Sequence, residues 1–334
     1  MSSKNKTTGT KDDVKAELVP KLRFPEFLET KEWASDKVDN LVDPVTPPKK
    51  LPTASYASSG AFPIIDQSQS DICGWTDDNE SLIWKGFPLI VFGDHTCTLR
   101  RISRPFAQGA DCIKILQSRS QIGTPFLFQF LSHRPVVTEE YKRHYSILKE
   151  KIVFYPDLQS GEQQKIADCL SSVDELIAAQ ARKVDALKTH KKGLMQQLFP
   201  REGETQPCRR FPEFQDAGDW EVKKIEDIAR RGSGHTPNKA KPEYYNGGIK
   251  WVSLADSKRL DNGKIFETAT LISELGIKNS SAVLHPAGSV ILSRDAGVGK
   301  SAVLNESMAV SQHFVVWTCD NSNLSNWFLY YFLQ

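Results

Sequence analysis

Short apolar runs alternate with polar segments over the first part of the chain. Residues 87–93 (FPLIVFG) and 112–116 (CIKIL) have the length and the flanking residues typical of strands. Residues 126–131 (FLFQFL) fit a short buried helix as well as a strand. The pattern predicts a domain of mixed strands and short helices over residues 20–157, after a polar leader at residues 1–19 that is expected to be disordered.

The pattern changes to a helical one after residue 158. Between residues 161 and 198 there is no proline, and the only interior glycine is Gly193. Ser160, followed by Glu162 and Gln163, predicts an N-cap with a capping-box partner. A helix of 38 residues would be about 57 Å long. We therefore predict one long helix within residues 158–200.

Apolar positions along this helix recur in steps of three and four, as in a coiled coil. Seven of nine heptad seam positions are apolar, and the exceptions are Gln180 and Lys191. The apolar seam positions are Leu170, Val173, Ile177, Val184, Leu187, Leu194 and Leu198. Such a seam predicts pairing with a second helix, from this chain or from another copy.

The chain carries an internal repeat. RFPEF occurs at residues 23–27 and again at 210–214, and Trp33 and Trp220 follow at the same spacing. The match suggests a duplicated domain, with a linker at 201–209 and a second domain at 210–334. FLYYFL near the end of this domain parallels FLFQFL of the first, but no second helical stretch follows it. We therefore expect the second domain to be incomplete and the second long helix to be absent.

Composition narrows the class of protein only a little. A net charge of +2 neither argues for nor excludes nucleic-acid binding, which needs local positive faces. The six cysteines are scattered without metal-ligand spacing, as expected of free thiols in a reducing cytoplasm. The sequence has no apolar run of the roughly 18–20 residues that span a membrane and no signal peptide, so a soluble cytoplasmic protein is expected.

Two stretches resemble a known family. YPDLQSGEQQKIADCLSSVDELI, from Tyr155 onward, together with the RFPEF-plus-Trp opening, resembles the specificity subunit of type I restriction–modification systems. GSGHTPNKAKPEYYNGGIKWVSLAD (232–256) resembles the opening of many target-recognition domains of that family, and ILSRDAGVGK (291–300) resembles their later hairpin. The resemblance extends over nearly all of residues 20–334.

The resemblance implies a fold and a set of partners. The fold would be mixed α/β, with two target-recognition domains separated by a long coiled-coil-like helix. Each domain would read half of a bipartite double-stranded DNA site, and the chain would recruit type I methyltransferase subunits, with restriction and translocase subunits as further partners. The chain itself would be noncatalytic and hold no cofactor or metal; S-adenosylmethionine, ATP and Mg would belong to the partner subunits.

Candidate DNA contacts fall in both domains. Hydroxyl, amide and basic side chains suit base edges and phosphates, although solvated loops explain the same residues. In the first domain the candidates are Tyr56, Ser58, His95, Thr96, Arg100 and Arg101. In the second they are Arg230, Arg231, Ser233, His235, Thr236, Lys239, Arg294 and Lys300. The basic stretch 181–193 fits the charged outer face of a coiled coil better than a DNA-binding strip.

Two short motifs look like parts of catalytic sites but do not fit them. GVGKS (297–301) lacks the first glycine of a P-loop, since position 294 is Arg, and it lies between apolar runs, so we predict a hairpin turn. Asp94 and His95 are neighbours in a strand-like segment and would point to opposite faces. Neither supports an enzyme.

Three interpretations remain open from the sequence. In one, two chains pair their seams and read a symmetric bipartite site. In another, the chain is a shortened or silent cassette with little activity alone. In the third, it is a decoy that binds methyltransferase subunits without reading DNA.

Overall fold

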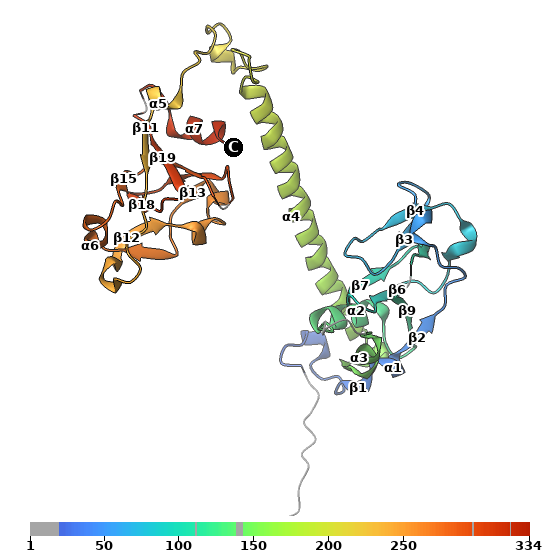
Figure 1. Cartoon of the computed structure of the whole chain (residues 1–334). Helices are drawn as coiled ribbons and strands as arrows, with labels where there is room; N and C mark the ends of the chain where they lie inside the picture. The colour runs from blue at the N-terminus through green and yellow to red at the C-terminus, as the bar shows by residue number, and fades with distance from the viewer. Residues whose placement is uncertain (1–19, 111, 138–142, 296, 321) are drawn as a thin grey trace, which may run out of the picture. The chain divides into compact units, whose positions relative to one another are not determined.

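The computed structural model describes residues 20–110, 112–137, 143–295, 297–320 and 322–334, so the leader at 1–19 lies outside the described residues. The chain divides into two compact units, residues 1–182 (unit 1) and 183–334 (unit 2). Both are built from short strands and short helices, and one long helix, α4 (Glu162–Leu198), is shared between them (Figure 1). The predicted fold class, mixed α/β with one long helix, is confirmed.

Unit 1 holds two four-stranded sheets and a two-stranded one. The sheet orders are β2-β9-β6-β7, β4-β3-β8-β5 and β1-β10. The strands are β1 Ala34–Lys37, β2 Val42–Val45, β3 Phe62–Ile65, β4 Gly74–Thr76, β5 Leu82–Ile83, β6 Leu89–Gly93, β7 Leu99–Ile102, β8 Phe106–Gln108, β9 Ile113–Ser118 and β10 Ile152–Tyr155. The helices before α4 are α1 Val38–Leu41, α2 Thr124–His133 and α3 Tyr145–Glu150. FLFQFL therefore forms a helix and not a strand, which decides between the two structures that its sequence allowed.

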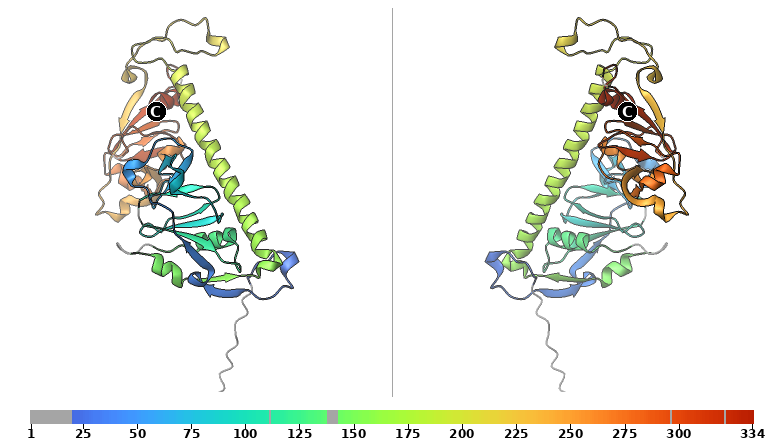
Figure 2. Two further views of the ribbon diagram at one scale, coloured as in Figure 1. Left: turned by 90° about the vertical axis from the view of Figure 1, so that its right-hand side faces the viewer. Right: turned by 90° about the vertical axis from the view of Figure 1, so that its left-hand side faces the viewer.

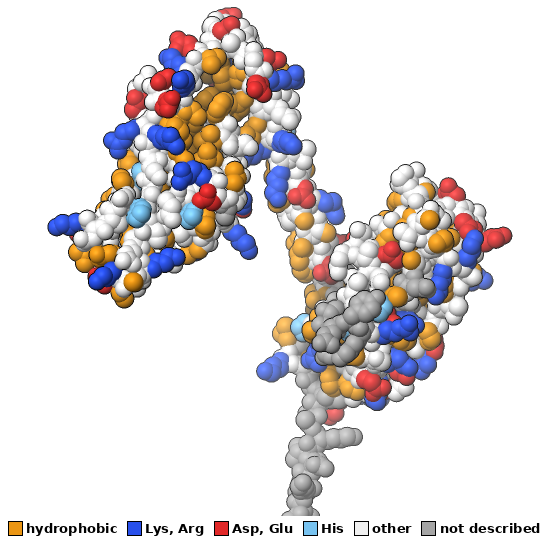
Figure 3. Space-filling model, in the orientation of Figure 1, with side chains coloured by type: hydrophobic (Ala, Val, Ile, Leu, Met, Phe, Trp, Pro, Cys, Tyr) orange, Lys and Arg blue, Asp and Glu red, His pale blue; other side chains and the backbone are white. Residues whose placement is uncertain are grey.

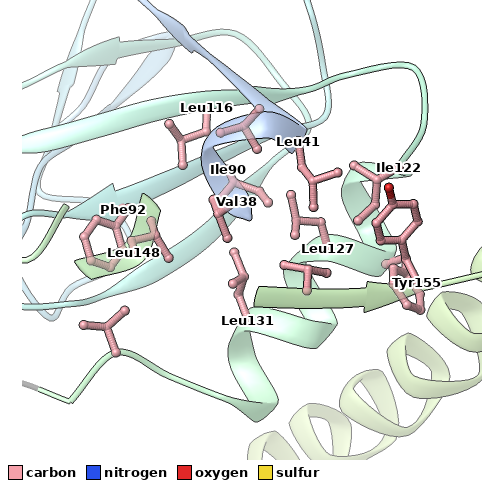
Figure 4. Close-up of a cluster of buried hydrophobic side chains, with 14 of the residues drawn as sticks. Val38, Leu41, Ile90, Phe92, Leu116, Ile122, Leu127, Leu131, Leu148 and Tyr155 are labelled. Carbon is pink, nitrogen blue, oxygen red and sulfur yellow. The ribbon is translucent and has the colours of Figure 1, made fainter. Parts of the chain in front are cut away.

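The main core of unit 1 lies between its helices and the β2-β9-β6-β7 sheet (Figure 4). Its labelled members are Val38, Leu41, Ile90, Phe92, Leu116, Ile122, Leu127, Leu131, Leu148 and Tyr155. β6 is buried along its whole length because it is a central strand of this sheet. Apolar burial on this scale is the dominant stabilising term of the unit.

Helix α4 runs without a break for 37 residues (Figure 2). It follows a left-handed Gly161 (φ 79°), and the Ser160 hydroxyl accepts a hydrogen bond from Glu162 N at 3.2 Å. The predicted capping-box partner is wrong. Glu162 binds Arg23 instead, and the Gln163 side chain bonds to the backbone of Gly123 and Pro156. The first turn of α4 is thus fastened to unit 1 by tertiary contacts, which outweigh the local motif.

Unit 2 holds two sheets, ordered β11-β19-β16-β17-β13 and β14-β12-β18-β15. The strands are β11 Arg230–Ser233, β12 Tyr245–Val252, β13 Lys264–Ile265, β14 Thr270–Ile272, β15 Leu284–His285, β16 Val290–Ser293, β17 Ser301–Leu304, β18 Met308–Val310 and β19 Phe314–Thr318. The helices are α5 Ile225–Ile228, α6 Glu274–Lys278 and α7 Asn326–Phe332. β17 is buried at every position, as expected for an interior strand.

The internal repeat is visible in the structure. The 3₁₀ turns η1 (Pro25–Phe27) and η5 (Pro212–Phe214) are 187 positions apart, and so are helices α1 and α5. Helices α2 and α7, which carry FLFQFL and FLYYFL, also correspond. The two units therefore share a 3₁₀ turn and two helices, whereas β1 has no counterpart strand between η5 and α5.

Candidate nucleic-acid interface

One end of the five-stranded sheet of unit 2 gathers polar side chains from three loops. The Thr236 hydroxyl donates to the Gln312 side-chain oxygen at 2.6 Å, and the Arg294 guanidinium donates to the Gln312 carbonyl. The His313 ring lies in hydrogen-bond contact with the Asp295 carboxylate. We call Thr236, Arg294, Asp295, Gln312 and His313 the loop cluster. Guanidinium, amide, imidazole and hydroxyl groups together are the set that reads base edges and phosphates.

The sheet register explains why these loops meet. Ser293 pairs with Phe314, and Ser233 pairs with Val315, so the residues just beyond each strand lie at one sheet end. Arg294 N also donates to His313 O at 2.9 Å. Thr236 and Arg294 were predicted from the sequence as DNA contacts, whereas Gln312 and His313 were not. The polar pair between the apolar runs of β18 and β19 was the available signal for a loop.

Gly234 allows the loop that follows β11 to lie against the sheet. His235 N donates to Val310 O at 3.0 Å, and a Cβ atom at Gly234 would lie 1.8 Å from that same oxygen. A Cβ atom at Gly232 would lie 2.7 Å from the ring of His285. Both glycines thus allow close packing within unit 2.

The segment with GVGKS connects β16 and β17, which pair antiparallel, so the predicted hairpin is confirmed. Gly297 and Gly299 both have positive φ, which glycine adopts without strain. Arg294 and Lys300 flank the connection, and the Lys300 ammonium lies 2.7 Å from the Asp261 carboxylate. The fold has a strand after this segment, where a P-loop would need a helix.

The remaining candidates of unit 2 lie along or beyond the edge strand β11. Arg230 and Arg231 pair with Thr318 and Trp317, near the far end of the strand from the loop cluster. Arg230 lies three residues before Ser233, a rise of about 10 Å along the strand, so the two arginines are separated from the loop cluster. The side chains of Arg230, Arg231, Ser233, His235 and Lys239 are exposed. The candidate DNA contacts of unit 2 therefore form two groups, one on β11 and one in the loop cluster.

His285 packs beneath β11. Its Nε2 lies 3.1 Å from Ser233 O. Burial lowers the pKa of the imidazole, the Ser233 contact opposes this, and the charge of Arg230 lowers the pKa further. His285 is accordingly a neutral packing residue under the edge strand at neutral pH.

In unit 1, Arg100 is buried, and its role differs from the one expected. Its guanidinium donates to the carbonyls of Asp66, at 2.9 Å, and Ser70, at 2.8 Å, and also to that of Ser68. The side chain is only 8% exposed. Arg100 fastens residues 66–70 to β7 and is not available to DNA in this conformation.

Tyr56 and Thr96 are likewise held by the protein. The Tyr56 hydroxyl accepts from Ala110 N at 2.7 Å and donates to Asp66 at 3.3 Å, and the Thr96 hydroxyl donates to Gln67 O at 2.7 Å. Burial raises the pKa of Tyr56. Both residues therefore support the loop that Arg100 fastens.

A groove of about 350 Å³ opens beside β7. Its basic lining comes from Arg100, Arg101 and Arg104, and Arg101 lies over the Phe128 ring at 5.8 Å from its centroid. Arg101 and Arg104 are exposed, unlike Arg100. Arg104 was not among the DNA contacts predicted from the sequence. Ser58 is exposed on another loop and His95 is half-buried, and neither lines this groove.

Asp94 serves a structural role. It is buried, and its carboxylate accepts from Tyr145 N at 2.8 Å at the start of α3. Across the described ranges, no group of three or more His, Cys, Asp or Glu side chains could hold a metal ion. No helix of the described part is both long and apolar enough to cross a membrane.

The seam of α4 is uncovered along much of its length. Leu170, Val173, Ile177, Val184 and Leu187 are between 44% and 62% exposed. Leu194 and Leu198 are half-buried. An exposed apolar stripe of this kind is typical of an interaction surface.

Parts of this chain are similar to DNA specificity subunits of type I restriction enzymes. Residues 217–334 match the family model "Type I restriction modification DNA specificity domain". The chain is 31% identical over 96 residues to the type I restriction enzyme MjaIX specificity subunit of Methanocaldococcus jannaschii, a match covering 29% of this chain and 22% of that protein. The chain thus aligns with about a fifth of the relative's length. The resemblance to specificity subunits that the sequence suggested is confirmed, and residues 217–334 match the DNA specificity domain of type I restriction–modification systems.

A solved structure shares the fold. The crystal structure of the type I restriction–modification S subunit from M. genitalium matches with a TM-score of 0.58 at 15% identity, covering 90% of this chain and 76% of that one. At this identity the likeness speaks for the fold alone.

Proposed function

We propose that this chain is the DNA-recognition and scaffold subunit of a type I restriction–modification complex in the cytoplasm. It reads a bipartite double-stranded DNA site and docks the methyltransferase subunits, with restriction and translocase subunits as further partners. It performs no chemistry itself, and S-adenosylmethionine, ATP and Mg are bound by the partner subunits. The specificity-domain match over residues 217–334 carries the proposal.

The loop cluster is the part of unit 2 that suits base readout. Its guanidinium, amide, imidazole and hydroxyl groups come from three loops at one sheet end, and the strands β16, β18 and β19 beneath them are largely buried. Rigid placement of such groups is what direct readout requires. The exposed Arg230 and Arg231 suit phosphates, which position a protein on DNA without specifying sequence.

The Arg101–Arg104 groove is the corresponding surface of unit 1. Two exposed guanidinium groups border it, and Arg100 holds the adjacent loop in place. In this proposal the exposed seam of α4 pairs with a second helix, either in another copy or in a partner, and contributes to the docking of methyltransferase.

The test is selection of bound sequences from a random duplex pool by the chain together with its methyltransferase partner. We expect one enriched motif, an affinity that falls steeply with salt, and loss of about tenfold in affinity for that motif with Arg294→Ala. Lys188→Ala, on the outer face of α4, is the matched control and should bind normally. Stable complex formation without any enriched motif would instead indicate a decoy or a silent cassette.

A further inference from the structure

One glutamine lies at the centre of the loop cluster. Gln312 is in the tight connection between β18 and β19, where Phe314 N donates to Ser311 O at 3.2 Å and closes a four-residue turn. Ser311 and Phe314, at the ends of the turn, are buried, whereas Gln312, at its first central position, is exposed. The turn therefore has a fixed base and presents the Gln312 side chain to solvent.

Arg294 holds this turn from the neighbouring hairpin. Its backbone N donates to His313 O at 2.9 Å, and its guanidinium Nη2 donates to Gln312 O. Ser311 N fastens the start of the turn to the end of β12, because it donates to Val252 O at 2.8 Å. Both central carbonyls of the turn thus accept from Arg294. Since part of the guanidinium is used within the protein, Arg294 is placed to position the turn.

Thr236 orients the side-chain amide of Gln312. The Thr236 hydroxyl donates to Gln312 Oε1 at 2.6 Å. The backbone on both sides of Thr236 is itself held, because Trp251 Nε1 donates to His235 O at 3.1 Å and Pro237 is buried. The oxygen of the amide is therefore the end that faces Thr236. A glutamine held in this way offers its donor and its acceptor in a defined order.

The nitrogen end of the amide lies beside His313. His313 Nε2 is 3.5 Å from Gln312 Nε2, and the contact of His313 Nδ1 with the Asp295 carboxylate fixes the imidazole in this place. An amide nitrogen carries two hydrogens, so His313 can engage one of them at most. The amide oxygen likewise has a second lone pair besides the one that Thr236 uses. Gln312 therefore keeps one donor and one acceptor for a ligand.

This pair of groups selects among the four bases. The major-groove edge of adenine carries the N6 amino donor beside the N7 acceptor, and the side-chain amide of glutamine matches both at once. Guanine has two acceptors on that edge, cytosine has the N4 donor, and thymine has the O4 acceptor beside its methyl group. Adenine is thus the base that uses both the donor and the acceptor of Gln312.

The surroundings of the amide suit a nucleic acid. Figure 3 shows histidine side chains at the surface of unit 2 with lysine and arginine side chains around them. Positive charges attract phosphates without selecting a sequence. The choice of base then depends on neutral groups with a fixed order of donor and acceptor, such as the Gln312 amide.

We propose that Gln312 reads an adenine in the half-site bound by unit 2, with Nε2 donating to N7 and Oε1 accepting from the N6 amino group. Thr236 and Arg294 are positioning residues, since the first orients the amide and the second holds the turn. This inference rests on the proposed function, because it names one base of the DNA site that the chain would read.

The test uses the motif that the chain and its methyltransferase partner select from the random duplex pool. At each adenine of that motif, 7-deazaadenine removes the N7 acceptor and purine removes the N6 amino group. At one adenine, each analogue should weaken binding by the unaltered chain about tenfold. With Gln312→Ala, neither analogue should bind more weakly than adenine. Gln215→Ala, at another exposed position of unit 2, is the control and should keep both losses.

A variant with a different side-chain order should prefer a different base. Gln312→Glu keeps the shape of the side chain but replaces its donor with an acceptor. Selection by this variant should therefore favour cytosine, which offers its N4 amino group, at the position of the adenine. Selection that still favours adenine in Gln312→Glu would contradict the proposed contact.

The positioning role of Thr236 has its own test. Thr236→Val removes the hydroxyl that orients the amide, so the preference for adenine should fall roughly fivefold, as expected from the loss of one neutral hydrogen bond. Thr236→Ser should restore the preference. The urea midpoint should be the same in both variants, which separates orientation of the amide from a structural role. Equal preferences of the two variants would overturn this role.

Failure of the inference differs from failure of the proposed function. An enriched motif without an adenine that depends on Gln312, or analogue losses that persist in Gln312→Ala, would overturn the inference alone. Absence of any enriched motif would overturn the proposed function and the inference with it. If Gln312→Ala does not fold, the analogues on the unaltered chain still decide, because the contact requires one adenine that is sensitive to the loss of both N7 and the N6 amino group.

Discussion

Arg23 and Glu162 form a bidentate ion pair across 139 positions of the chain, and both side chains are nearly inaccessible, at 3% and 1% exposed. The pair joins the RFPEF turn to the first residue of α4. It lies just beneath the surface, because Arg23 as a whole residue is only half-buried. One interaction thus connects the start of unit 1 to the long helix that leaves it.

Removing one partner of this pair should destabilise unit 1. Arg23→Ala leaves the Glu162 carboxylate buried without its cation, and a loss of roughly 2–3 kcal/mol in the free energy of unfolding is expected, between exposed and deeply buried pairs. Urea unfolding followed by a unit 1 signal, such as Trp33 fluorescence, measures it. The exposed Lys37–Glu150 pair is the control, and Lys37→Ala should leave the midpoint unchanged. Equal effects of the two substitutions on the unfolding midpoint would contradict a stabilising role for the Arg23–Glu162 pair.

Arg100 and Arg101 are neighbours in β7, but replacing them should have different effects on stability and DNA binding. Arg100→Ala removes the donors that fasten residues 66–70, so this loop should exchange amide hydrogens faster, and unit 1 should lose about 2–3 kcal/mol of stability. Arg101→Ala should leave stability nearly unchanged and weaken DNA binding by about tenfold, because its exposed guanidinium borders the groove. Hydrogen exchange and DNA affinity, measured on both variants, separate the roles. Unchanged hydrogen exchange of residues 66–70 in Arg100→Ala would contradict the structural role of Arg100.

The buried imidazole of His285 should make unit 2 sensitive to acid. Its folded-state pKa is lowered below 6.5, mainly by burial, so the unfolded chain binds the proton more readily. The stability that this group contributes is complete above pH 6.5 and is lost as the pH falls toward the folded-state pKa. Urea unfolding between pH 5 and pH 8 should show the decline, and His285→Asn should flatten it. His190→Asn, at an exposed position on α4, should not change the slope.

The seam of α4 should control assembly. Leu187→Glu puts a charge into the exposed apolar stripe, so pairing with a second helix and formation of the methyltransferase complex should fail while unit 1 stays folded. Ala186→Glu, one residue earlier on the outward face, adds the same charge outside the seam and should assemble normally. Size-exclusion chromatography with light scattering compares the two. Normal assembly of Leu187→Glu would mean that the seam is assigned wrongly.

Local sequence signals predicted the elements but not the roles of several side chains. The long helix, the strands of β6 and β9 and the hairpin at 294–300 follow from periodicity and glycine placement, which are local properties. The burial of Arg100 does not, because its carbonyl partners lie on a loop 30 to 34 positions earlier in the chain. Gln312 and His313 join Thr236 and Arg294 only through the sheet register, which no local pattern specifies.

The repeat illustrates the same limit. RFPEF and the following Trp predict a duplication, and the elements η1 and η5, and α1 and α5, bear it out. The repeat does not show that the Arg23 guanidinium binds Glu162, whereas the Nε atom of Arg210 has no hydrogen-bond partner within the described part of the chain. That difference depends on what covers each copy, and only the three-dimensional structure contains it.

The most direct measurement is the methylome of a methylation-free host that expresses this chain with its cognate methyltransferase subunit. The account predicts one bipartite methylated motif that disappears when the chain is omitted. Two different half-sites would mean that both units read DNA, and two identical ones would mean that unit 1 acts in a helix-paired dimer. A confirmed complex that methylates no motif would contradict the claim that this chain is a DNA-recognition subunit.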